Sequence, residues 1–247
     1  MAPDAGAEAS AGLAPLAGEW MQKLENPSDH VDYVSPPLGA TASRPVVIAL
    51  HGMDARPEWV CNDFRATFGP WPFVVCPRGD ARSPANYSWG STVGMQRAIT
   101  RALAAAEARF PGYVGATGRV LVTYSQSASM APAMLASPAA KGDPEPVRFH
   151  GAFFLEGFTK NIGSLAPAMA KRGLTHAIFF ATQAGNRPPA EASARASKRA
   201  GVTAQAVYGG ALGHWFTPKT VPALRLGVPL LVEGLDGWEA YPGPPSQ

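Results

Sequence analysis

The chain has 247 residues, of which 46% are hydrophobic and 16% are charged, and its formal net charge is +3 at pH 7. This length and apolar content are enough for one large core, so a single domain over residues 19–247 is expected. The arginines are scattered, and no stretch reaches the roughly 18 apolar residues of a membrane span, so neither nucleic-acid binding nor a transmembrane segment is predicted.

The N-terminal residues 1–18 are rich in Ala, Gly, Glu and Pro and are expected to be disordered or loosely docked. They lack the basic and apolar regions of a signal peptide. The protein is therefore interpreted as soluble, and either cytoplasmic or exported with its signal trimmed away. Composition leaves the oligomeric state open.

The first elements after this segment are short. Residues 19–24 are compatible with a short helix, and residues 30–34 alternate like an edge strand. Residues 45–50 form a continuous apolar run that is typical of a strand buried on both faces of a parallel sheet. That run ends in His51-Gly52-Met53.

A helix is expected over residues 56–69 and a buried strand over residues 72–77. Cys61 and Cys76 fall in these two elements, where they could form a disulfide or remain two buried thiols. The loop 78–91 follows the end of a strand, where ligands bind in open α/β sheets, so Tyr87 and Trp89 are candidates for a pocket or for its rim. Ser91 or Thr92 can cap the helix that follows.

A strand over residues 118–123 runs into Thr123-Tyr124-Ser125-Gln126-Ser127 and then into Ala- and Met-rich helical sequence. This small-x-Ser-x-small pattern between a strand and a helix is the pattern of a nucleophile elbow, in which a tight turn exposes a serine hydroxyl. A second register centred on Ser127 fits the same pattern but places the serine inside the helix, so Ser125 is preferred. Pro132 is expected to kink or shorten that helix.

The rest of the chain continues the alternation. Strands are expected over residues 149–155, 176–181 and 203–208, and helices over 164–172, 190–200 and part of 218–241. His214 lies in a loop after the last of these strands. The regular succession of buried strands and amphipathic helices predicts a doubly wound, mostly parallel α/β sheet flanked by helices.

The octapeptide at residues 123–130, Thr-Tyr-Ser-Gln-Ser-Ala-Ser-Met, resembles the Gly-Tyr/Phe-Ser-Gln-Gly-Ala-x-Met elbow of small carboxylesterases, cutinases and dienelactone-hydrolase-like enzymes of the α/β-hydrolase family. Both elbow glycines are replaced here. The resemblance implies the α/β-hydrolase fold, Ser125 as nucleophile and the Gln126 backbone N–H as an oxyanion donor. The His-Gly dipeptide lies at the oxyanion loop of that family, which implies the Met53 N–H as the second donor.

The sequence around His214, Gly-His-Trp-Phe, resembles the Gly-His-x-Phe motif of the family base, whereas His51 is interpreted as an organiser of its loop. The triad acid is the open point. The family carries it in a Gly-x-x-Asp motif after the next-to-last strand, where residues 181–189 contain no Asp or Glu. Glu156 at the end of the preceding strand is favoured, with Asn186 and Glu191 as alternatives.

The chemistry expected from these residues is that of a serine hydrolase that cleaves carboxylic esters through an acyl-enzyme, with a small-molecule ester as its partner. A binding protein that has lost catalysis and an acyltransferase with the same Ser-His pair are the alternatives. No cofactor or metal site is predicted, because the five histidines fall in five separate elements. The candidates for the substrate pocket are His51, Gly52, Tyr87, Trp89, Tyr124 and Trp215.

Overall fold

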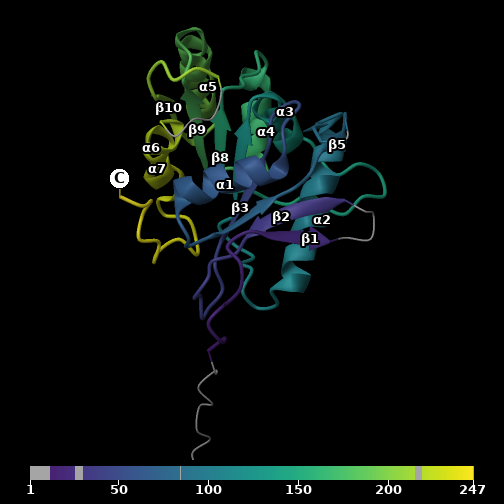
Figure 1. Cartoon of the computed structure of the whole chain (residues 1–247). Helices are drawn as coiled ribbons and strands as arrows, with labels where there is room; N and C mark the ends of the chain where they lie inside the picture. Colours follow the sequence, from purple (N-terminus) through teal and green to yellow (C-terminus); the bar gives the residue numbers. More distant parts are fainter. Residues whose placement is uncertain (1–11, 26–29, 84, 215–218, 247) are drawn as a thin grey trace, which may run out of the picture.

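We describe a computed structural model of the chain, in which residues 12–25, 30–83, 85–214 and 219–246 are described. The main sheet has eight strands in the order β1-β2-β4-β3-β7-β8-β9-β10 (Figure 1). The strands are β1 (Gln22–Glu25), β2 (Val31–Ser35), β3 (Val46–Leu50), β4 (Phe73–Cys76), β7 (Val120–Tyr124), β8 (Gly151–Leu155), β9 (His176–Ala181) and β10 (Thr203–Tyr208). A separate two-stranded hairpin is made by β5 (Asp80–Ala81) and β6 (Tyr87–Ser88).

Strands β4, β3, β7, β8, β9 and β10 pair in parallel, whereas β1 and β2 add an antiparallel edge. The central strands β3, β4, β7 and β8 are buried along their whole length, because helices cover both faces of the sheet. The predicted doubly wound, mostly parallel sheet is confirmed.

The helices divide between the two faces of the sheet (Figure 1). One face packs against α2 (Thr92–Arg109), α3 (Gln126–Ala136), α4 (Ile162–Lys171) and α5 (Arg187–Arg199). The other face packs against α1 (Pro57–Phe68), α6 (Thr220–Arg225) and α7 (Val228–Val232). Alternate strand residues point to opposite faces, so Phe154 joins the first core and Phe153 the second.

Two local expectations were wrong, and the helix expected to be kinked or shortened at Pro132 is continuous. Residues 22–25 form strand β1 instead of a helix, because pairing with β2 and burial of Leu24 outweigh the weak helical preference of so short a segment. Helix α3 runs through Pro132 to Ala136, since its packing between α2 and α4 holds it in place. The C-terminal segment forms two short helices, α6 and α7, instead of one.

The structure answers the question of the two cysteines, because Cys61 in α1 and Cys76 at the end of β4 form a disulfide. This bond ties α1 to the sheet. Near the N-terminus, the backbone of Leu13 and Leu16 hydrogen-bonds to Thr41 and Ala40, so residues 12–18 dock on the domain; residues 1–11 of the predicted N-terminal segment lie outside the described residues. Among the described residues, no helix has both the length and the apolar character needed to cross a membrane.

Candidate active site

The turn between β7 and α3 holds Ser125 in an unusual backbone conformation. Its φ is 57° and its ψ is −112°, in a region that residues other than glycine rarely adopt. The turn is fixed by the Ser125 N–H, which donates to the Leu155 carbonyl of β8 at 2.8 Å. A Cβ atom on Gly157 would lie 2.1 Å from the Ser125 carbonyl oxygen, so only glycine allows the segment after β8 to approach the turn this closely. The strained turn is therefore maintained by the neighbouring strand.

The residues that replace the two glycines of the elbow pattern are accommodated by hydrogen bonds. Thr123 Oγ1 donates to the Phe153 carbonyl at 3.0 Å. Ser127 Oγ accepts from the Tyr124 N–H at 2.9 Å, and it lies 3.0 Å from the carbonyl oxygens of both Leu50 and Tyr124, to which its proton can be donated. Because Ser127 is completely buried and engaged in this way, its hydroxyl is not available to a ligand. The geometry thus favours the register centred on Ser125.

Ser125 Oγ lies 2.8 Å from Nε2 of His214, although the two residues are 89 positions apart in the chain. His214 follows β10, the last strand, and its ring packs at 5.4 Å, between centroids, from that of Tyr124. The Tyr124 hydroxyl also donates to the His214 carbonyl at 2.5 Å, and Thr182 Oγ1 donates to the neighbouring Gly213 carbonyl. The loop that carries His214 is therefore held from both β7 and β9.

Glu156 stands on the other side of the imidazole. Its Oε2 lies 3.6 Å from Nδ1 of His214, and its side chain is almost completely buried. Three donors hold this carboxylate: the backbone N–H groups of Thr182 and Gln183 bind Oε1, and the Asn186 side-chain amide donates to Oε2 at 2.7 Å. These bonds fix the orientation of the Glu156 carboxylate.

The positions of the three candidate triad acids distinguish them. Glu156 is the carboxylate beside His214, whereas Asn186 is bound to Glu156. Glu191 lies on α5 and pairs with Arg187 at 2.9 Å and Arg195 at 3.9 Å. The loop 181–189, which lacks an acid, instead supplies the donors that hold Glu156.

The two backbone N–H groups that were predicted to bind an oxyanion come from the start of α3 and from the loop after β3. Gln126 is the first residue of α3, where backbone N–H groups have no partner within the helix. Met53 lies in the turn after β3, and within the described part of the chain its N–H has no hydrogen-bond acceptor. The next N–H, of Asp54, donates to Ser88 Oγ at 3.1 Å and so anchors the turn.

His51 connects the loop after β3 with the loop after β4. Its Nε2 accepts from the Gly79 N–H at 3.1 Å, so the proton resides on Nδ1, which donates to the Gly52 carbonyl at 2.7 Å. Burial lowers the pKa of His51 to about 4, although the hydrogen bond to Gly52 opposes this change. A neutral, completely buried ring with both nitrogens engaged organises the loop, as the sequence indicated.

Trp89 completes this arrangement. Its ring stacks on that of His51 at 4.7 Å and its Nε1 donates to the His51 carbonyl at 2.7 Å. Its backbone exchanges two hydrogen bonds with the Gln126 side chain, at 3.0 and 3.2 Å. The position of the Ser125 turn is thus coupled to the loops after β3 and β4.

Several of the residues predicted to line a pocket have other roles. The side chains of His51 and Trp89 are buried in the loop network, where their polar atoms bind the backbone. Gly52 is buried too, and a Cβ there would lie 3.1 Å from the Tyr124 ring and 3.2 Å from Ser125 Cβ. Tyr87 is partly exposed, with Arg78 4.9 Å from its ring centre. Trp215 lies outside the described residues.

Tyr124 does line a cleft, which has a volume of about 590 Å³. The other walls come from the outer face of α1 and from the start of β1, and they include Trp20, Met21, Trp59 and Asp63. None of these four residues was predicted from the sequence. The cleft joins segments that are distant in the chain, and the spacing of residues 58, 59, 62 and 63 on one face of α1 is the local signal of it.

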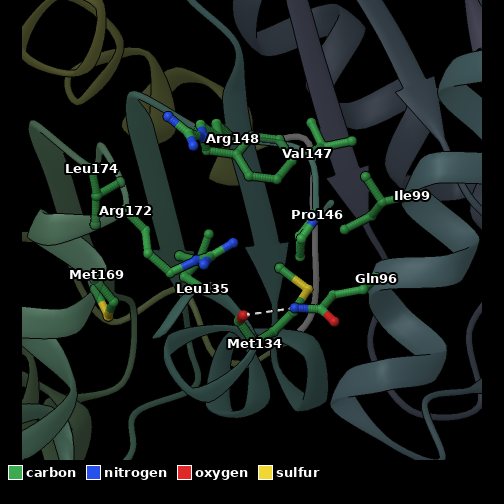
Figure 2. A pocket seen from close by; sticks show the side chains of 11 residues that line it. Gln96, Ile99, Met134, Leu135, Pro146, Val147, Arg148, Met169, Arg172 and Leu174 are labelled. Atoms are coloured by element: carbon green, nitrogen blue, oxygen red, sulfur yellow. Dashed lines mark hydrogen bonds between the residues drawn. The ribbon is translucent and has the colours of Figure 1, made fainter. Parts of the chain in front are cut away.

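A second cavity lies where β8 begins, at the opposite end of the strands from the Ser125 turn (Figure 2). It is framed by Gln96 of α2, Met134 and Leu135 of α3 and Arg172 after α4, and the Gln96 amide donates to the Met134 carbonyl across it at 3.1 Å. Its volume of about 20 Å³ has room for roughly one water molecule. An ester substrate does not fit there.

Comparison with known proteins relates this fold to others. No protein-family model and no curated protein sequence matches the chain. Among solved structures, a putative dienelactone hydrolase from Klebsiella pneumoniae subsp. pneumoniae aligns with a TM-score of 0.61 and 14% identity, over 86% of this chain and 98% of its own. Acyl-protein thioesterase 2 from Zea mays aligns at 0.53 and 17%, over 81% and 98%. A Bacillus cereus carboxylesterase aligns at 0.51 and 14%, over 79% and 91%.

Proposed function

The chain has the α/β-hydrolase fold, and we propose that it is a serine hydrolase that cleaves carboxylic esters through an acyl-enzyme intermediate. The observation that carries this proposal is the 2.8 Å contact between Ser125 Oγ, on its strained turn, and Nε2 of His214. A serine hydroxyl needs such a base to become a nucleophile at neutral pH. The similar structures carry names of esterases and thioesterases, which agrees with this chemistry.

In the first half of the reaction, Ser125 Oγ attacks the ester carbonyl carbon while His214 Nε2 takes the hydroxyl proton. Glu156 faces Nδ1 and stabilises the imidazolium that forms. The carbonyl oxygen becomes an oxyanion, which the N–H groups of Met53 and Gln126 bind; the loss of one such donor typically costs about 2.7–4 kcal/mol. When the tetrahedral intermediate collapses, the bond to the alcohol oxygen breaks and His214 returns the proton to the alcohol.

In the second half, water takes the place of the alcohol. His214 removes a proton from the water as its oxygen attacks the acyl carbon, and a second oxyanion forms in the same place. Its collapse breaks the bond to Ser125 Oγ, which takes the proton back from His214, and releases the carboxylic acid. An alcohol acceptor in place of water would give acyl transfer by the same residues. The ratio of acid to new ester in the presence of added alcohols separates the two reactions.

The test is labelling of the purified protein with a fluorophosphonate, followed by peptide mass spectrometry. We expect one adduct, on Ser125, which disappears in His214→Ala and forms at least 10³-fold more slowly in Glu156→Gln, because an amide cannot stabilise the imidazolium. Ser164→Ala, which changes an exposed serine of α4, is the matched control and keeps the label.

Two results would contradict the proposal. An adduct on Ser127 would move the reactive residue out of the Ser125 turn. A complete lack of labelling in a folded protein would favour a binding protein that retains the fold without the chemistry.

A further inference from the structure

The cleft beside Tyr124 combines aromatic walls with negative charge. Trp20 and Trp59 are large apolar side chains with exposed fractions of 44% and 52%, and both face the cleft. Of the described residues that line it, Glu58 and Asp63 are acidic, and none is Lys, Arg or His. An apolar acyl chain alone would leave the Asp63 carboxylate without a counter-ion, so the composition of the walls favours a ligand with a positive charge.

The two carboxylates differ in their partners. Glu58 lies 3.4 Å from Arg56, whose guanidinium also stands 5.8 Å from the Trp59 ring centre. Asp63 accepts a hydrogen bond from the neighbouring Asn62 amide at 3.4 Å and, within the described part of the chain, forms no ion pair. Asp63 is thus the carboxylate of the cleft whose charge is available to a ligand.

The surroundings of Asp63 also favour a cationic ligand. Burial raises the pKa of Asp63 to about 6, against a smaller opposing effect of the Asn62 amide. Burial, the Glu156 charge and, as the smallest of the three effects, the Asp63 charge raise the pKa of Tyr124. Asp63 and Tyr124 therefore interact electrostatically across the cleft. A cation seated between them would relieve the unfavourable burial of the Asp63 carboxylate.

The cleft and the proposed reactive centre share one residue. Tyr124 precedes Ser125, its hydroxyl binds the His214 carbonyl, and its ring forms a wall of the cleft. A substrate whose ester lies at Ser125 can therefore extend along Tyr124 into the cleft. Organic cations with an apolar body bind between aromatic rings and a carboxylate, where a single ring contributes about 0.5–2 kcal/mol.

We propose that this cleft binds an alkylammonium group of the ester substrate, with Trp20 and Trp59 as walls and Asp63 as the residue that selects for positive charge. The assignment rests on the proposed ester hydrolysis and names its substrate class: esters that carry a quaternary or protonated amine a few bonds from the carbonyl.

The experiment uses matched pairs of esters that differ in charge alone. One pair carries the charge on the acyl side, as the aryl ester of trimethylammoniobutyrate and its neutral isostere with a tert-butyl group. The other pair carries the same two groups on the alcohol side of an acetate ester. We expect the cationic member of at least one pair to have a kcat/KM about tenfold higher or more, which corresponds to about 1.4 kcal/mol.

The variants identify the residues responsible. Asp63→Asn should reduce the ratio of cationic to neutral kcat/KM to near one, and Trp59→Ala should reduce it severalfold. Asp143→Asn changes a carboxylate on the far side of the molecule, where it pairs with Arg97, and should leave the ratio unchanged. Equal kcat/KM for both members of both pairs, or a ratio that survives in Asp63→Asn, would overturn the proposal.

A calorimetric titration with the trimethylammoniobutyrate anilide, a non-hydrolysable amide, separates this inference from the catalytic one. Binding that is lost in Asp63→Asn, in a protein that hydrolyses none of the esters, would retain the cation site and refute the hydrolase. Hydrolysis of the esters without charge preference would retain the hydrolase and refute the cation site.

Discussion

The side-chain amide of Asn186 donates a hydrogen bond to Glu156 Oε2 across 2.7 Å, and the same oxygen lies 3.6 Å from Nδ1 of His214. Asn186 therefore acts on the imidazole through the carboxylate. The chain has no acid in the loop after β9, and it uses an amide of that loop to hold an acid that comes from the end of β8.

Removal of this amide tests its role as a positioning residue. Asn186→Ala deletes one of the hydrogen bonds to a charged group, each of which typically contributes about 1.5–3 kcal/mol. We expect kcat for ester hydrolysis to fall roughly tenfold or more while KM changes little, because the Glu156 carboxylate acts on the transition state. Gln205→Ala on β10 removes an exposed amide and is the control. A change in KM alone would show that Asn186 serves substrate binding instead.

The close packing of Gly157 against the Ser125 turn gives a second prediction. The Cβ of Gly157→Ala would lie 2.1 Å from the Ser125 carbonyl oxygen and 2.8 Å from Ala128 Cβ, so the turn must shift. We expect a loss of about 1–3 kcal/mol in the free energy of unfolding, and at least a tenfold slower fluorophosphonate labelling. Gly163→Ala on α4, where no atom lies within 4 Å of the added Cβ, should leave both unchanged or raise stability slightly.

The neutral His51 should make stability depend on pH. Folding lowers its pKa from 6.5 to about 4, so the unfolded chain binds the proton more tightly. The stabilisation is complete above pH 6.5 and is lost as the pH falls to 4, up to about 3 kcal/mol. Urea unfolding of His51→Gln should show lower stability at pH 7 and a flatter dependence between pH 6.5 and 4. An unchanged dependence would assign the proton uptake to another group.

Asp63 should change the pH dependence of stability in the direction opposite to that of His51. Folding raises its pKa from 3.8 to about 6, so the folded chain holds the proton more tightly and is destabilised as the pH rises through 6. With the side chain partly exposed, about 1 kcal/mol is expected. Asp63→Asn should therefore unfold at higher urea concentration than wild type at pH 8 and at a similar concentration at pH 4. Lower stability of the variant at pH 8 would mean that the charge is compensated in the fold.

The sequence could predict the sheet and the Ser125 turn because both follow from local patterns. Buried parallel strands appear as continuous apolar runs, and the turn requires small residues around one serine. The strand β1 could not be predicted, because four residues become a strand only through pairing with β2. Trp89 was expected at a pocket, and its burial depends on a partner, His51, that only the folded chain brings beneath it.

The interlocked side chains of His51, Trp89 and Gln126 have a consequence for engineering of this protein. Each of the three residues supplies a hydrogen-bond partner or a stacking surface to a residue in another loop. Exchange of one residue leaves buried polar groups of the other two without partners, whereas exchange of all three can restore a consistent set. The loops after β3 and β4 and the start of α3 must therefore be transplanted or randomised together, as one module, if a library is to retain folded members.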